Sequence, residues 1–215
     1  MWQIETHCHT LLSKDSLVRP ADLVAAARRK NLDRVIITDH NSITGALAAQ
    51  ASDPERVIVG EEIMTPQGEI LAFFVRELVP PGLEALHTIE ILRQQGAFIS
   101  VSHPFDVLRG GHWELRDLEA IAPLVDAIEV FNARCLRPGY NEQAQTFAKL
   151  HDLPGTAGSD AHALCELGRA RLALPPFRDA HELRSVIRQA QVLGRLSSPW
   201  VHLASRYAVW RKRLG

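Results

Sequence analysis

Histidine and acidic side chains gather near the start of the chain. His7 and His9 flank Cys8, and Asp15 follows shortly after. Because successive side chains of a strand point to opposite faces, a strand ending here presents both imidazoles on one face and Cys8 on the other. Imidazoles and carboxylates are ligands for divalent transition metals. The spacing indicates a metal site, although a His-x-His pair also occurs at strand ends that have no catalytic role.

Alternating elements must position these side chains. Apolar runs predict strands at residues 2–5, 34–37, 57–60, 97–101, 127–132 and 171–173, with one more before Gly158. Helical periodicity and end signals predict helices at residues 20–30, 44–51, 82–95, 115–121, 141–151, 179–191 and 205–213. This alternation is typical of parallel α/β architecture. Residues 62–65 and 69–75 depart from it, because residues 66–68 between them predict a hairpin.

Polar side chains recur where the predicted strands end. They are His7, His9, Asp39, His40, Glu62, His103, Asn132, Asp160 and His162. In parallel α/β folds the carboxyl ends of the strands meet at one rim, where the functional side chains gather. So many buried imidazoles and carboxylates would repel each other or be poorly solvated without cations. The pattern therefore predicts a cluster of divalent metal ions.

Composition restricts the class of protein. A chain of 215 residues, 46% of them apolar, is long enough for one domain with a full core. The formal net charge of −1 does not indicate a broad basic face for nucleic acid or for a membrane. Three cysteines without a Cys-x-x-Cys motif favour a reducing cytoplasm over a disulfide framework. We expect no signal peptide and no membrane span.

The successive motifs resemble those of the polymerase and histidinol phosphatase (PHP) superfamily. They are His7-Cys8-His9-Thr10 with Asp15, Ile37-Thr38-Asp39-His40, Gly60-Glu61-Glu62, Ser102-His103-Pro104 and Gly158-Ser159-Asp160-Ala161-His162. The resemblance covers residues 3–175, and residues 168–199 are similar to the tail of small stand-alone members. It implies an α/β fold, a distorted (β/α)7 barrel, as a single domain over residues 1–215. Residues 176–215 would be a C-terminal helical extension.

The resemblance also implies a set of metal ligands. His7, His9, Glu62 and Asp160 would hold the first of two to three ions of Mn, Fe or Zn. Glu62, chosen over Glu61 because the family pattern is Gly-x-Glu, would bridge to a second ion that His103 binds. Asp15, His40 and His162 would hold the third. Asn132 stands where the family often has His or Cys, so it is a weak candidate for the last protein ligand of the second ion.

Further roles follow for residues near these ligands. Hydroxide activated by the metals is the expected nucleophile. His103 or His162 is a candidate proton donor to the leaving oxygen, a role that falls to water if both are metal ligands. Asp39 is expected to orient a ligating imidazole. Arg134 either grips the substrate phosphate or forms a surface salt bridge. Four histidines off the strand ends are expected to be surface or structural residues: His112, His151, His181 and His202.

The predicted activity is metal-dependent hydrolysis of a small phosphomonoester, under a roof made by residues 104–114 and 133–141. Alternatives are an exonuclease that acts on short oligonucleotides, an amidohydrolase-type metal hydrolase and a catalytically silent metal-binding protein. The amidohydrolase alternative expects a ligating lysine or further histidines on the middle strands, whereas these strands offer Glu62 and no suitable lysine. The basic cluster of Arg206, Arg211, Lys212 and Arg213 could contact nucleic acid, but a solvated helix face is the favoured interpretation. No obligatory protein partner is expected.

Overall fold

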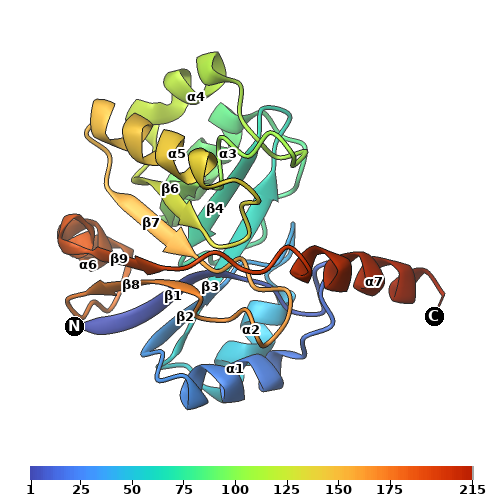
Figure 1. Ribbon diagram of the computed structural model, residues 1–215. Helices are drawn as coiled ribbons and strands as arrows, with labels where there is room; N and C mark the ends of the chain where they lie inside the picture. The colour runs from blue at the N-terminus through green and yellow to red at the C-terminus, as the bar shows by residue number, and fades with distance from the viewer. Residues whose placement is uncertain (215) are drawn as a thin grey trace.

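A nine-stranded sheet curves into a nearly closed barrel at the centre of the computed structural model, which describes residues 1–214 (Figure 1). The strands are β1 Trp2–Cys8, β2 Arg34–Ile37, β3 Val57–Met64, β4 Glu69–Phe73, β5 Phe98–Val101, β6 Ala127–Asn132, β7 Gly155–Gly158, β8 Ala170–Leu174 and β9 Gln191–Gly194. Neighbouring strands are hydrogen-bonded in the order β7-β6-β5-β4-β3-β2-β1-β8-β9.

Helices cover the outside of this sheet. They are α1 Pro20–Arg29, α2 Thr44–Ser52, α3 Ala85–Gln95, α4 Leu115–Ile121, α5 Pro138–Leu150, α6 Ala180–Val186 and α7 Val201–Arg213, with the short 3-10 helices Ala122–Leu124 and Ile187–Gln189. α1 and α2 lie on one side of the barrel and α3, α4 and α5 on the opposite side (Figure 1). α7 extends away from the barrel. Among residues 1–214, none of the helices has the length and apolar character that a bilayer crossing requires.

Strand directions confirm the predicted α/β barrel and its hairpin. β1 with β2, β2 with β3, β5 with β6 and β6 with β7 are parallel pairs. β4 runs antiparallel to both β3 and β5. The predicted strands 57–60 and 62–65 form one continuous strand, β3, because Gly60 and the two glutamates after it stay in register with β4. β3 therefore carries Glu62 in its interior.

The barrel closes at β1, which has different neighbours along its length. Its first half pairs with β8 in antiparallel fashion, from Trp2 opposite Leu174 to Ile4 opposite Leu172. Its second half meets the segment after β7, where His9 N donates to Ala161 O at 2.9 Å. This seam brings His7 and His9 next to the segment that carries Asp160 and His162.

An irregularity in β1 sets the direction in which the side chain of His7 points. Ile4 and Thr6 line an enclosed apolar space inside the barrel, whereas Cys8 belongs to the apolar layer between the sheet and the helices. Strict alternation would place Cys8 on the same side as Ile4. The register with β2 shifts between Glu5 and Cys8, and such a bulge re-aims the side chains that follow it. His7 consequently faces the strand-end cluster.

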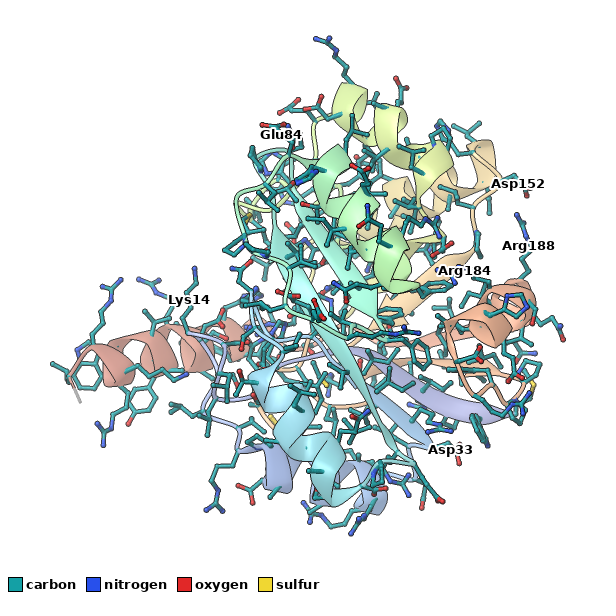
Figure 2. All side chains as sticks on the ribbon, turned by 180° about the vertical axis from the view of Figure 1, so that it is seen from behind. Lys14, Asp33, Glu84, Asp152, Arg184 and Arg188 are labelled. Atoms are coloured by element: carbon teal, nitrogen blue, oxygen red, sulfur yellow. The ribbon has the colours of Figure 1, made fainter. Side chains whose placement is uncertain are left out.

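The C-terminal segment differs in detail from its prediction. Helix 179–191 was expected, but α6 ends at Val186 and Gln191 begins β9, which pairs with β8. β9 is largely exposed and carries no buried alternation, so the sequence gives no strand signal there. In Figure 2, Arg188 and Asp152 lie close together, and Arg188 Nη1 is 3.0 Å from Asp152 Oδ1. This exposed pair links the 3-10 helix after α6 to the turn after α5.

The three cysteines form no disulfide. Cys8 and Cys135 are buried, Cys165 is exposed, and all three are free thiols. The cytoplasmic location inferred from them stays a prediction.

Candidate metal centre

Glu62 lies at the centre of a buried cluster of imidazoles at the carboxyl ends of the strands. Its Oε2 is 3.3 Å from His7 Nε2, 3.4 Å from His9 Nε2 and 3.0 Å from His40 Nδ1. Its Oε1 is 3.3 Å from His103 Nε2. One carboxylate therefore faces four imidazoles, which lie at the end of β1 and in the turns after β2 and β5. A carboxylate that bridges metal ions needs such a position between their ligands.

Two aspartates complete the cluster. Asp160 Oδ1 is 3.2 Å from His9 Nε2 and 3.3 Å from His162 Nδ1. Asp15 Oδ2 is 3.1 Å from His162 Nε2 and 3.7 Å from His40 Nε2. The structure thus brings together the side chains of His7, His9, Asp15, His40, Glu62, His103, Asp160 and His162.

Several of these buried atoms have no hydrogen-bond partner within residues 1–214. They are His7 Nε2, His9 Nε2, Asp15 Oδ1, Glu62 Oε2, Asp160 Oδ1 and His162 Nε2. Leaving a buried polar atom unpaired costs roughly 1–3 kcal/mol, more for a charged one, and a coordinated cation removes that cost. Three groups have ligand atoms within 4.8 Å of one another: His7, His9 and Glu62; His9, His40 and His162; and His40, Glu62 and Glu69. The donor set therefore fits divalent metal ions.

The charges in the cluster are strongly coupled. Burial lowers the pKa of His9 to about 3, with the neighbouring His162 and His40 acting in the same direction. Burial also opposes the charged form of His7, but Glu62 and other carboxylates outweigh it and raise the pKa of His7 well above its usual value. A neutral His9 has one ring nitrogen without a proton, and this nitrogen is available as a ligand. Divalent metal ions would stabilise this cluster, because both carboxylates and a neutral imidazole can bind them.

Glu129 in β6 orients the first imidazole, a role that the sequence reasoning missed. Its Oε1 is 2.9 Å from His7 Nδ1, and its Oε2 accepts hydrogen bonds from His103 N at 2.9 Å and from Asn132 Nδ2 at 3.1 Å. Anchoring Nδ1 in this way leaves His7 Nε2 directed at Glu62. The signal in the sequence was a charged residue inside an otherwise apolar strand.

Asp39 acts on the cluster through a serine. Its carboxylate accepts from Thr10 N, Thr10 Oγ1 and Ser13 Oγ, each at 2.6 Å. Ser13 Oγ is 3.0 Å from His9 Nδ1. The imidazole that Asp39 helps to position is therefore His9 rather than the adjacent His40.

Asn132 and Arg134 are near the cluster, but other protein groups already bind them. Asn132 Nδ2 donates to Asp160 Oδ2 at 3.2 Å, while Asn132 Oδ1 accepts from Arg134 N at 2.9 Å. Arg134 is buried, its Nη2 donates to Ser205 Oγ at 2.9 Å, and its Nε is 3.5 Å from Glu166 Oε1. These contacts favour neither a ligand role for Asn132 nor a surface salt bridge for Arg134, and the phosphate grip of Arg134 stays a prediction.

A cleft of about 640 Å³ opens above the cluster. Its lining includes Lys14, Asp15, His40, Glu69, Arg109, Arg134, His162, His202, Ser205 and Arg206. The predicted roof loops contribute Arg109 and Arg134, and α7 adds a wall that the sequence did not indicate. His202, expected to be a surface or structural residue, lines the cleft and its Nε2 is 3.2 Å from Arg134 O.

Arg109 is the cation nearest to the ligands. Its Nη1 forms an ion pair with Asp160 Oδ2, and its Nη2 is 3.4 Å from Asn132 Oδ1. Burial disfavours the charged guanidinium, but Asp160 outweighs burial and raises the pKa of Arg109 further above its usual value. Arg109 lies in a loop without periodicity or motif, so no sequence signal identified it.

Two family models match the chain. The model described as PHP domain matches residues 5–80, and the model described as PHP-associated matches residues 138–192. An uncharacterised protein of Methanocaldococcus jannaschii is 33% identical over 171 residues, which are 78% of this chain and 68% of that protein. A second from the same organism is 35% identical over 123 residues, 55% of this chain and 69% of that protein. The chain belongs to the PHP family.

Solved structures share the fold of this chain. PsfC from Pseudomonas syringae has a TM-score of 0.69 at 22% identity, covering 100% of this chain and 99% of its own. An amidohydrolase from Chromobacterium violaceum has a TM-score of 0.65 at 14% identity, covering 86% and 97%. A candidate metal-dependent phosphoesterase from Bifidobacterium adolescentis has a TM-score of 0.61 at 21% identity, covering 75% and 87%. Membership of the PHP family and the clustered ligands together support a metal-dependent hydrolase with a divalent-metal site.

Proposed function

We propose that this PHP protein is a phosphoesterase that hydrolyses a small phosphomonoester with two to three Mn, Fe or Zn ions. The observation that carries the proposal is the position of Glu62, whose carboxylate faces four imidazoles at the floor of a cleft with basic walls. A phosphate monoester brings up to two negative charges, which suit such a cleft. The name of the Bifidobacterium protein of the same fold agrees with this reaction class.

The chain supplies ligands for each ion. His7, His9, Glu62 and Asp160 would hold the first, Glu62 and His103 the second, and Asp15, His40 and His162 the third. Bound metal ions would lower the pKa of a coordinated water and neutralise charge on the phosphate oxygens. Glu129 and Ser13 hold His7 and His9 in the orientation that this requires.

Basic side chains of the cleft would bind the substrate. Arg109 and Lys14 line the cleft beside the ligands, and either can donate hydrogen bonds to phosphate oxygens. Arg134 fixes the inner wall through Ser205 of α7. His103 Nε2 and His162 Nε2 face the carboxylates of the cluster and would bind metal ions, so the proton for the leaving oxygen would come from water.

A phosphodiesterase acting on short oligonucleotides is the second candidate. The observation that favours it is α7, where Arg206 lines the cleft and the exposed rings of Tyr207 and Trp210 follow on the same helix. Aromatic rings next to basic side chains bind single-stranded nucleic acid through stacking.

Ester hydrolysis by the metal-loaded protein tests the proposal, with inorganic phosphate measured for monoesters and the released phenol or nucleotide measured for diesters and oligonucleotides. The substrates would be aryl phosphates, mononucleotides, aryl phosphodiesters and short oligonucleotides, each with Mn, Fe or Zn. We expect turnover of monoesters and a loss of at least about 100-fold in His9→Ala and Asp160→Ala. Turnover of diesters or oligonucleotides alone would favour the second candidate. Unchanged turnover in both variants would contradict the metal mechanism.

A further inference from the structure

The second ion of the proposed site has only two assigned protein ligands, Glu62 and His103. The side chain at the end of β6, Asn132, is engaged on every side. Its amide nitrogen donates to Glu129 and Asp160, and its amide oxygen accepts from Arg134 N and faces Arg109. An amide used in this way has no free oxygen to offer an ion.

Glu69, at the start of β4, lies on the other side of His103. Its Oε2 is 3.4 Å from His103 Nε2, and its Oε1 is 3.6 Å from His40 Nδ1. The residue is 6% exposed, and it forms one of the three ligand groups with His40 and Glu62. Two carboxylates therefore approach the same imidazole nitrogen from the β3–β4 hairpin, since Met64 and Glu69 pair across it.

The loop after β5 holds Glu69 in this place. Glu69 N donates to Gly111 O at 3.0 Å, and Glu69 O accepts from Trp113 Nε1 at 3.1 Å. A Cβ atom on Gly111 would collide with Glu69 Oε2, so the absence of a side chain at Gly111 makes room for the carboxylate. Two hydrogen bonds between the backbone of Glu69 and the loop, together with the space at Gly111, thus position the carboxylate.

We infer that Glu69 is the third protein ligand of the second ion, together with Glu62 and His103. The inference rests on the proposed multinuclear site and assigns it a ligand from β4 instead of one from β6. Two carboxylate oxygens and one imidazole form a harder ligand set than a site of two imidazoles and one carboxylate. Such a set favours Mn or Fe(II) at this position over softer ions.

Metal content tests the assignment without any substrate. The wild type, Glu69→Gln and Asn132→Ala would be loaded with Mn, dialysed against metal-free buffer and analysed for Mn per chain. We expect Glu69→Gln to lose about one equivalent and Asn132→Ala to keep the wild-type content, because only the first removes an ionised oxygen ligand. Full Mn content in Glu69→Gln, or loss of an equivalent only in Asn132→Ala, would overturn the assignment.

Glu61→Gln is the matched control, because Glu61 is a buried carboxylate of the same hairpin whose Oε2 accepts from Val79 N at 3.1 Å. It should keep its Mn. If Glu69→Gln fails to fold, Gly111→Ala replaces it in the experiment. The added Cβ should displace the Glu69 carboxylate and weaken binding of the same ion. Unchanged Mn binding in Gly111→Ala overturns the assignment. A wild type with fewer than two Mn would overturn the multinuclear site as well. A wild type that binds Mn as expected but releases no phosphate would contradict the proposed function only.

Discussion

At the scale of single residues, the site depends on side chains that touch the ligands rather than on the ligands alone. Glu129 is 1% exposed, and both of its oxygens accept hydrogen bonds, one from His7 and the other from a backbone amide and a side-chain amide. A carboxylate can accept on both oxygens, whereas a glutamine cannot. The charge of Glu129 is therefore part of how His7 is presented to a metal ion.

Glu129→Gln tests this dependence. The glutamine amide has one NH2 group in place of an acceptor oxygen, and this group would face either His7 Nδ1 or His103 N, which are both donors. One hydrogen bond is therefore lost, and the imidazole of His7 is less firmly oriented. We expect metal affinity to fall by about 10- to 100-fold, the range typical of groups that support metal ligands. Competition with a chelator of known affinity measures the change. The exposed Glu142 provides a control, Glu142→Gln, and equal affinities in the two variants would contradict the role of Glu129.

A second prediction at this scale concerns pH. Burial raises the pKa of Glu61 from 4.5 to about 7, so the folded state holds a proton that the unfolded chain releases near pH 4.5. Because the folded state binds this proton more tightly than the unfolded chain does, Glu61 contributes stability below pH 4.5. This contribution is lost as pH rises toward 7. Relative to Glu61→Gln, the wild type should lose on the order of 3 kcal/mol of unfolding free energy across this window. Urea unfolding of both proteins at pH 4.5, 6 and 7.5 measures it, and a difference independent of pH would refute the shift.

At the scale of elements, the order of strands and the residues at their ends followed from the sequence, because apolar runs and turn residues are local signals. The seam between β1 and the segment after β7 did not, since it joins residues about 150 positions apart through backbone contacts that leave no periodicity. Glu69 and Arg109 were missed for the same reason, because only the folded hairpin and loop bring them to His103 and Asp160. α7 was predicted as a helix, but its contact with the cleft depends on tertiary packing.

The β1–β7 seam makes its own prediction through Gly158. A Cβ at Gly158 would collide with the Cβ of His7 and press on Glu129 Oε1. Gly158→Ala should therefore push β1 away from β7, destabilise the fold by about 1–3 kcal/mol and weaken metal binding together. Thermal unfolding and metal titration measure the two effects. Gly139→Ala is the control, because a Cβ there meets open space. Normal metal binding in Gly158→Ala would show that the seam tolerates the extra atom.

At the scale of the whole molecule, a net charge of −1 conceals an uneven distribution. Lys14, Arg109 and Arg206 line the cleft, although the chain carries one more acidic than basic residue. α7 is tied to the first strand-end loop, where Lys212 Nζ donates to Leu11 O at 2.5 Å, and Figure 2 shows Lys14 close to the same helix. The C-terminal helix thus places positive charge at the entrance to the metal centre.

Substrate capture should therefore depend on α7 even though no ligand comes from it. Arg206 is exposed, so its attraction for a phosphate is that of a surface ion pair, up to about 1 kcal/mol. In Arg206→Ala we expect KM for the best phosphomonoester to rise about 2- to 5-fold with kcat unchanged, because the contact is equal in ground and transition states. Added salt should remove the difference by screening the charge. Arg178→Ala removes the same charge from an exposed arginine paired with Glu182, and it should leave KM unchanged. Equal KM values in both variants would show that the basic face of α7 does not contribute to binding.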